Sequence, residues 1–113
     1  MTVTIYHNPR CNTSRQTLAL LEKKGVKPQV VEYLKTPPTA VELKQLLAKL
    51  GLRPRELLRK KEAKEAGLGE SELSDAQLIA GMVKHPIAIE RPIVVKGNRA
   101  ALGRPPEAVL KIL

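Results

Sequence analysis

The order of elements at the start of the chain constrains its fold more than any other feature. β-branched residues predict a strand at Thr2–Tyr6, and Asn8-Pro9 predicts a turn directly after it. Helical periodicity follows from Ser14 to Lys24, and a second strand is expected at Val26–Leu34. Two strands joined by a helix of this length favour a right-handed parallel βαβ unit. The chain is therefore expected to open as an α/β protein.

The rest of the chain predicts helices followed by a hairpin. Residue patterns and capping boxes place helices at Ala40–Leu50, 53–61 and 75–84, a largely loop segment at Glu62–Glu72, strands at Pro92–Lys96 and Arg99–Leu102, and a last helix at Glu107–Leu113. We therefore expect an α/β fold with a mixed sheet of about four strands, the first two parallel and the last two a hairpin. At 113 residues, residues 1–113 are expected to form a single domain.

Composition excludes several classes of protein. One cysteine cannot form an intramolecular disulfide, a multi-cysteine zinc site or a two-cysteine redox centre, and we expect no bound metal. No apolar run approaches the ~20 residues needed to span a bilayer, and no signal peptide is visible, so we expect a cytoplasmic protein without a membrane partner. The net charge of +9 favours an anionic ligand. Because Tyr is the only aromatic type, with two copies, a base-stacking nucleic-acid module is not expected.

The single cysteine, Cys11, lies in the turn between the first strand and the first helix. Unpaired N–H groups and the helix dipole favour negative charge at that position. Arg10 and Arg15 flank it, His7 lies four residues before it, and the Ser14 hydroxyl could donate a hydrogen bond to it. Each of these groups would lower the thiol pKa below its free value of about 8.5.

The alternative for Cys11 is a buried structural cysteine, which is the commoner role of a lone thiol. Its polar neighbours offer no apolar pocket and favour the reactive role instead. His7 is interpreted as an orienting or charge-supplying group rather than a metal ligand, with a turn residue of no particular role as the alternative. His85, before Pro86, is interpreted as structural.

Three arginines fall at predicted element boundaries: Arg59, Arg91 and Arg104. Arginine suits planar, bidentate recognition of oxyanions. Together with a helix N-terminus, three converging arginines would form a site for a tetrahedral oxyanion. Sequence spacing does not establish that they converge, and taken singly each fits an ordinary surface arginine.

The chain resembles a known family, the glutaredoxin-type arsenate reductases (ArsC family), and in particular its short chromosomal branch. The segments that carry the resemblance are Tyr6–Leu18, Tyr33–Thr39, Glu56–Lys60, Asp75–Ile79, His85–Ile87, Glu90–Val95 and Gly103–Glu107. These segments follow one another over nearly the whole chain, so the resemblance does not depend on one short motif.

The resemblance implies a thioredoxin-like fold with an inserted helical region at about residues 39–84. It implies that Cys11 is the nucleophile, that His7 and Ser14 tune its thiolate, and that Arg59, Arg91 and Arg104 hold the arsenic oxyanion. Pro92 stands where the fold keeps a cis proline beside the thiol, which is an uncommon and functional geometry. Arg10 and Asn12 depart from the family pattern, in which smaller residues precede and follow the cysteine.

The resemblance also implies a reaction and its partners. Arsenate would form a covalent adduct with Cys11, which glutathione, as co-substrate, and glutaredoxin would resolve, giving arsenite in a role in arsenical resistance. No cofactor would be bound, and nothing in the sequence demands more than a monomer.

Two alternative functions belong to the same fold. Redox-sensing regulators that bind RNA polymerase typically carry a Cys-x-x-Cys pair, whose second position is Ser14 here. A general thiol transferase acting on glutathionylated proteins would have no need of three oxyanion-binding arginines. Both features favour the reductase.

Overall fold

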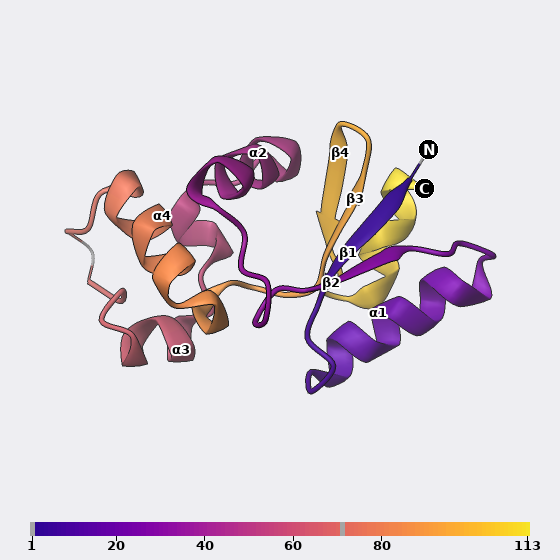
Figure 1. Ribbon diagram of the computed structural model, residues 1–113, viewed down its shortest axis with the longest axis horizontal. Coiled ribbons are helices and arrows are strands. Elements are labelled where there is room, and N and C mark those ends of the chain that lie inside the picture. Colours follow the sequence, from indigo (N-terminus) through magenta and orange to yellow (C-terminus); the bar gives the residue numbers. More distant parts are fainter. Residues whose placement is uncertain (1, 71) are drawn as a thin grey trace. The chain divides into compact units, whose positions relative to one another are not determined.

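The structure is a computed structural model that describes residues 2–70 and 72–113. The chain divides into two compact units, of which the first runs to Thr36 and resumes at Arg91, and the second is Pro37–Glu90 (Figure 1). The helical insertion expected at about 39–84 corresponds to this second unit. The assignment of both units to one domain stays a prediction.

The first unit contains a four-stranded mixed sheet in the order β2-β1-β3-β4. The strands are β1 (Val3–His7), β2 (Gln29–Glu32), β3 (Ile93–Lys96) and β4 (Arg99–Leu102). β1 pairs in parallel with β2 and antiparallel with β3, and β3 and β4 form a hairpin. The predicted α/β class, with two parallel strands and a terminal hairpin, is confirmed.

One face of this sheet is covered by the helix α1 (Asn12–Lys23) and the 3₁₀ helix η3 (Pro106–Ile112), as Figure 1 shows. Their shared core is aliphatic and consists of Val3, Ile5, Leu21, Val94 and Val109. The last helix is 3₁₀ and not α-helical as expected. β2 is shorter than predicted at both ends. Its pairing begins at Gln29, after Pro28, which has no N–H to donate, and a turn in which the Lys35 N–H donates to the Glu32 carbonyl follows it.

The second unit is built from helices. They are α2 (Ala40–Leu50), η1 (Pro54–Leu57), α3 (Lys60–Glu65), α4 (Asp75–Lys84) and η2 (Pro86–Ala88). Both predicted capping boxes are present, Thr39 with Glu42 and Ser74 with Gln77. Within the described residues, no helix combines the length and apolar character needed to cross a membrane.

The segment from 53 to 72 differs from its prediction. The helix expected at 53–61 is interrupted at Leu58, which is extended and forms a β-bridge with Ile89. A tertiary contact therefore overrides local helix propensity there. Part of the predicted loop Glu62–Glu72 belongs to α3, and Ser71 within that loop lies outside the described residues.

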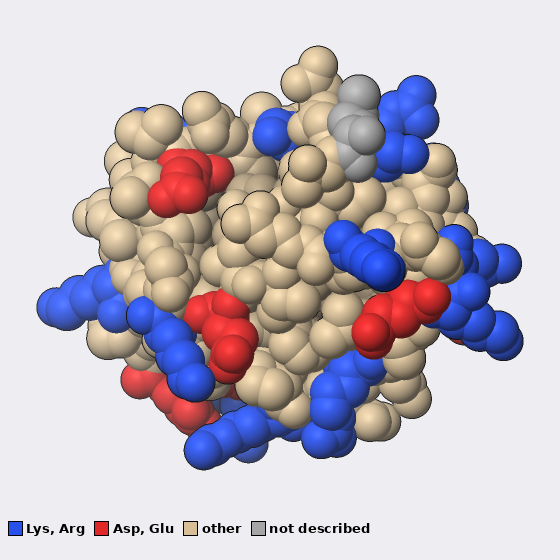
Figure 2. Space-filling model, turned by 45° about the vertical axis from the view of Figure 1, so that its right-hand side comes forward, with Lys and Arg blue, Asp and Glu red and all other residues tan. Residues whose placement is uncertain are grey.

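The surface carries charges of both signs. On the face shown in Figure 2, Lys and Arg side chains project at separate places with Asp and Glu side chains between them. The positive charge on this face is therefore not gathered into one continuous patch.

Candidate active site

The turn between β1 and α1 is held by Asn8, a buried residue that makes three hydrogen bonds. Its carbonyl accepts from the Cys11 N–H at 3.0 Å, and its side-chain oxygen accepts from the Arg10 N–H at 3.0 Å. Its own N–H donates to the Ser14 hydroxyl oxygen at 3.1 Å. An Asn-Pro pair suits the first two positions of such a turn. Asn8 therefore fixes where the chain enters the helix.

Cys11 is the N-cap residue of α1. Its backbone is extended, with φ −91° and ψ 121°, and its carbonyl accepts from the Arg15 N–H at 3.0 Å. The position expected for the cysteine, at a helix start, is confirmed. The residue is partly exposed.

Two arginine side chains hydrogen-bond the Cys11 sulfur. The Nη2 atom of Arg104 lies 3.8 Å from Sγ, and the Arg91 side chain also hydrogen-bonds the thiol. Arg91 is buried just before β3, whereas Arg104 is exposed just after β4. The structure therefore brings together two of the three arginines that the sequence analysis singled out.

The β3–β4 hairpin explains why these two arginines converge. Ile93 pairs with Leu102, so the residues just beyond this pair continue to face one another. The Arg104 Nε donates to the Arg91 carbonyl at 2.8 Å, which orients the Arg104 guanidinium. The Arg91–Pro92 peptide bond is cis, the geometry expected for it, and the Arg104–Pro105 bond is cis as well.

The pKa of the Cys11 thiol is lowered by this environment. Burial of the sulfur alone would raise it, but hydrogen bonds from the Ser14 backbone N–H and the Arg91 side chain, with the charges of Arg91 and Arg104, outweigh burial. The predicted direction is confirmed.

The groups responsible for the lowered thiol pKa differ from those expected. Arg91 and Arg104 are the cations that act on the sulfur, and the sequence neighbours Arg10 and Arg15, both exposed, are not. Ser14 acts through its backbone N–H, because its hydroxyl is engaged with His7 and Asn8 instead.

His7 and Ser14 form a buried pair at the end of β1. The His7 Nδ1 lies 2.6 Å from the Ser14 hydroxyl oxygen. Burial lowers the pKa of His7, with Arg15 adding to the effect and Glu32 opposing it. A neutral imidazole orients Ser14 and the first turn of α1 but supplies no positive charge. Of the two roles left open by the sequence, this geometry favours the orienting one.

The free energy of unfolding should fall as the pH is lowered from neutrality through the ordinary histidine pKa of about 6.5. The unfolded chain takes up a proton there that His7 resists in the folded state, so stability rises with pH across this range. The contribution is at most ~1.4 kcal/mol per pH unit. Denaturant titrations at several pH values give the slope of the unfolding free energy against pH. We expect a shallower slope for His7→Asn than for the parent. The matched control His85→Asn should retain the part of the slope that His7 contributes. An unchanged slope in His7→Asn would contradict this.

Arg59 lies in the second unit, at the N-cap of α3. Its guanidinium pairs with two carboxylates, at 3.1 Å from Glu62 Oε2 and 3.1 Å from Glu90 Oε1. Its predicted role as an oxyanion ligand stays a prediction.

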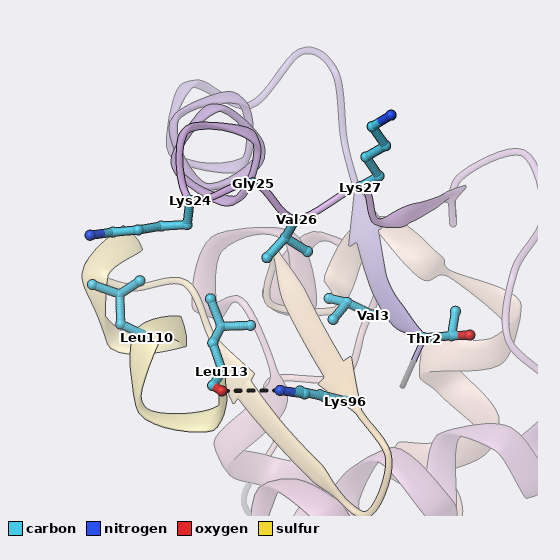
Figure 3. A pocket seen from close by; sticks show the side chains of 9 residues that line it. All are labelled: Thr2, Val3, Lys24, Gly25, Val26, Lys27, Lys96, Leu110 and Leu113. Carbon is cyan, nitrogen blue, oxygen red and sulfur yellow. Dashed lines mark hydrogen bonds between the residues drawn. The ribbon is translucent and has the colours of Figure 1, made fainter.

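A cavity of about 740 Å³ lies in the first unit at the start of β1 and the end of α1, the opposite ends of these elements from His7 and Cys11. In Figure 3 the side chains of Val3, Val26 and Leu113 point into it, while those of Lys24 and Lys27 point away. Lys96 is engaged by the Leu113 carbonyl oxygen at 3.0 Å. No lysine of this cavity is therefore placed to clamp an anion, in contrast to the arginines at Cys11.

Sequence patterns assigned no role in the site to Asn8, which holds the turn before Cys11, or to Thr17 and Gly103, which lie close together beside Pro92. The Asn-Pro turn signal could have identified Asn8, but only the tertiary structure reveals the contact between Thr17 and Gly103. Across the described ranges, no cluster of three or more His, Cys, Asp and Glu side chains is arranged to hold a metal ion.

The mixed four-stranded sheet, with its cysteine at the start of the first helix, is the architecture of a thioredoxin-like protein. The family model of the ArsC family matches residues 6–112. The chain belongs to the ArsC family.

Two sequence relatives and one solved structure are similar to the chain over most of their own lengths. The chain is 54% identical to the uncharacterized protein YfgD of Escherichia coli K12, with 98% of this chain and 96% of that one covered. It is 50% identical to an arsenate reductase of Rhizobium meliloti, covering 100% of this chain and 82% of the relative. A solved structure of an arsenate reductase from Vibrio cholerae superposes with a TM-score of 0.95 at 56% identity, covering 100% and 98% of the two chains.

Proposed function

We propose that the protein is a cytoplasmic arsenate reductase that uses glutathione and glutaredoxin. The observation that carries the proposal is the placement of Arg104, whose exposed guanidinium lies 3.8 Å from the Cys11 sulfur. A tetrahedral oxyanion beside the sulfur would find two guanidinium groups there, Arg104 and Arg91. The names of the similar arsenate reductases support arsenate as that oxyanion.

In the first step, the Cys11 thiolate attacks arsenic and a sulfur–arsenic bond forms. One oxygen of arsenate leaves as water after it takes up protons. Arg91 and Arg104 neutralise the negative charge that a thiolate and an oxyanion bring together, which is the largest obstacle to this attack. The lowered pKa of Cys11 keeps the sulfur in its nucleophilic form near neutral pH.

The reduction itself needs thiols from outside the chain. Conversion of arsenic from the pentavalent to the trivalent state takes two electrons, which the joining of two thiols as one disulfide supplies. Because the chain has one cysteine, it cannot form that disulfide internally. We propose that glutathione displaces a second oxygen of the adduct and that a glutaredoxin thiol then attacks the glutathione sulfur. The products are a glutathione–glutaredoxin disulfide and trivalent arsenic on Cys11, from which water releases arsenite.

The test is a coupled assay with arsenate, glutathione, glutaredoxin, glutathione reductase and NADPH. We expect NADPH consumption that depends on the protein and on arsenate and that stops when glutaredoxin is omitted. A glutathionylated peptide offered in place of arsenate is the control for thiol transfer. Turnover of the peptide without turnover of arsenate would replace the proposed function by a thiol transferase, and turnover of neither would remove both.

A further inference from the structure

Gly103 occupies a position with no space for a side chain. A Cβ atom there would lie 2.5 Å from Thr17 Oγ1, 2.7 Å from Pro92 Cγ and 3.0 Å from Thr17 Cγ2. All three distances are shorter than ordinary van der Waals contact. Gly103 does not have a positive φ, so its backbone conformation does not by itself call for glycine. The requirement for glycine is therefore one of space.

Neither wall of this contact can yield easily. Thr17 is completely buried on α1, and its hydroxyl donates to the Thr13 carbonyl at 2.9 Å. Pro92 is also fully buried, and its side chain is a ring with little freedom to move. A side chain at position 103 would therefore displace the chain at the end of β4 rather than its neighbours.

The chain at the end of β4 carries Arg104. The Gly103 N–H donates to the Pro92 carbonyl at 3.0 Å, and the Arg104 Nε donates to the Arg91 carbonyl at 2.8 Å. These two bonds extend the β3–β4 pairing as far as the arginines. Any displacement of Gly103 away from Thr17 therefore also moves the Arg104 guanidinium relative to the Cys11 sulfur.

We propose that Gly103 is a positioning residue for the oxyanion site: its bare backbone, packed against Thr17 and Pro92, places the Arg104 guanidinium at the Cys11 sulfur. Substrate positioning by this contact rests on the proposed function, whereas the placement of Arg104 at the sulfur does not. A misplacement of about 1 Å in a catalytic arrangement can cost about 100-fold in rate, so the effect is measurable.

The test compares Gly103→Ala with the matched control Gly69→Ala. A Cβ at Gly69 would meet Lys64 at no less than 3.4 Å, an ordinary contact, in the second unit. The thiol pKa is measured from thiolate absorbance and the Kd of arsenate by calorimetry. We expect Gly103→Ala to raise the thiol pKa and to weaken arsenate binding about tenfold or more, while Gly69→Ala leaves both unchanged.

Two further variants show whether the effect passes through this contact and Arg104. Gly103→Ala combined with Thr17→Ala, which removes two of the three close atoms, should move the thiol pKa back toward the parent value. In an Arg104→Ala background, Gly103→Ala should have no further effect on the thiol pKa. A full additional rise there would overturn the proposal.

Three other outcomes are decisive. If Gly103→Ala lowers only the melting temperature and leaves the thiol pKa and the arsenate Kd at parent values, the residue is structural and the proposal is overturned. If Gly103→Ala does not fold, Thr17→Val tests the same contact, because it replaces the hydroxyl that faces Gly103 with a larger methyl group. An unchanged thiol pKa in Thr17→Val would overturn the proposal. If the parent does not bind arsenate, the proposed function fails, and the thiol pKa still decides the role of Gly103.

Discussion

Cys11→Ser should abolish arsenate reduction, with a loss of at least about a thousandfold in the rate of arsenite formation. A serine hydroxyl at the start of α1 keeps the size and polarity of the thiol but is not ionised near neutral pH. The Cys11 thiol pKa, in contrast, is lowered by Ser14, Arg91 and Arg104. The nucleophile is lost while its surroundings remain.

Arsenate binding serves as the control for this variant. Arg91 and Arg104 are unchanged in Cys11→Ser, so the Kd of arsenate measured by calorimetry should stay within a few fold of the parent value. A variant that binds arsenate and does not reduce it separates the anion site from the nucleophile. Arsenite formation at close to the parent rate would rule out Cys11 as the attacking group and with it the proposed chemistry.

Local sequence signals predicted the thiol's position correctly because the interactions that hold it are local. The Asn-Pro turn and the helix after it span only residues 8–23, and the hydrogen bonds of Asn8 reach no further than Ser14. Capping boxes and hairpin turns are similarly short-range, and those predictions held. The prediction failed around Leu58, where pairing with distant Ile89 replaced a locally favoured helix.

The cations of the site could be predicted only in part. Hairpin register alone puts Arg91 opposite Arg104. Lys96 pairs with Arg99 next to the turn, and following the same register along both strands away from the turn leads to Arg91 and Arg104. Their nearness to Cys11, however, depends on β1 lying beside β3, a pairing between residues about ninety positions apart. Nearness in sequence pointed to Arg10 and Arg15 instead, both of which are exposed and do not act on the thiol pKa.

Packing around a glycine leaves no signal in a single sequence. The residues around Gly103 do not show whether glycine is required because a side chain would not fit or because the backbone turns there. A glycine at such a position is usually interpreted as a turn residue. The distances from Thr17 and Pro92 supply the distinction. The positioning role proposed for Gly103 therefore follows from tertiary contacts alone.

Arg91→Ala and Arg104→Ala should each slow arsenate reduction by about 100- to 1,000-fold, the usual cost of removing one group that stabilises a developing oxyanion. Both variants should also raise the thiol pKa, because each removes a positive charge near the sulfur. The larger rise is expected for Arg91→Ala, since Arg91 contributes both a hydrogen bond and its charge and is the more buried of the two.

The rise in the Cys11 thiol pKa should also change how the rate of arsenate reduction depends on pH. Because only the thiolate attacks, the rate of the first step should fall as the pH drops through the lowered pKa of Cys11, and in either variant this fall should begin at higher pH. Stopped-flow measurement of single-turnover adduct formation over a pH series checks the displacement. Arg→Lys at each position should restore part of the pKa shift, as a charge remains, but less of the arsenate affinity, as the planar guanidinium is lost.

Arg10→Ala is the matched control, because it removes a cation that adjoins Cys11 in sequence without acting on its pKa. The backbone N–H of residue 10, which donates to Asn8, is retained in this variant. Its thiol pKa, arsenate Kd and pH profile should therefore equal those of the parent. An Arg10→Ala effect as large as that of Arg104→Ala would mean that general positive charge, and not two guanidinium groups held by the β3–β4 hairpin, activates the thiol.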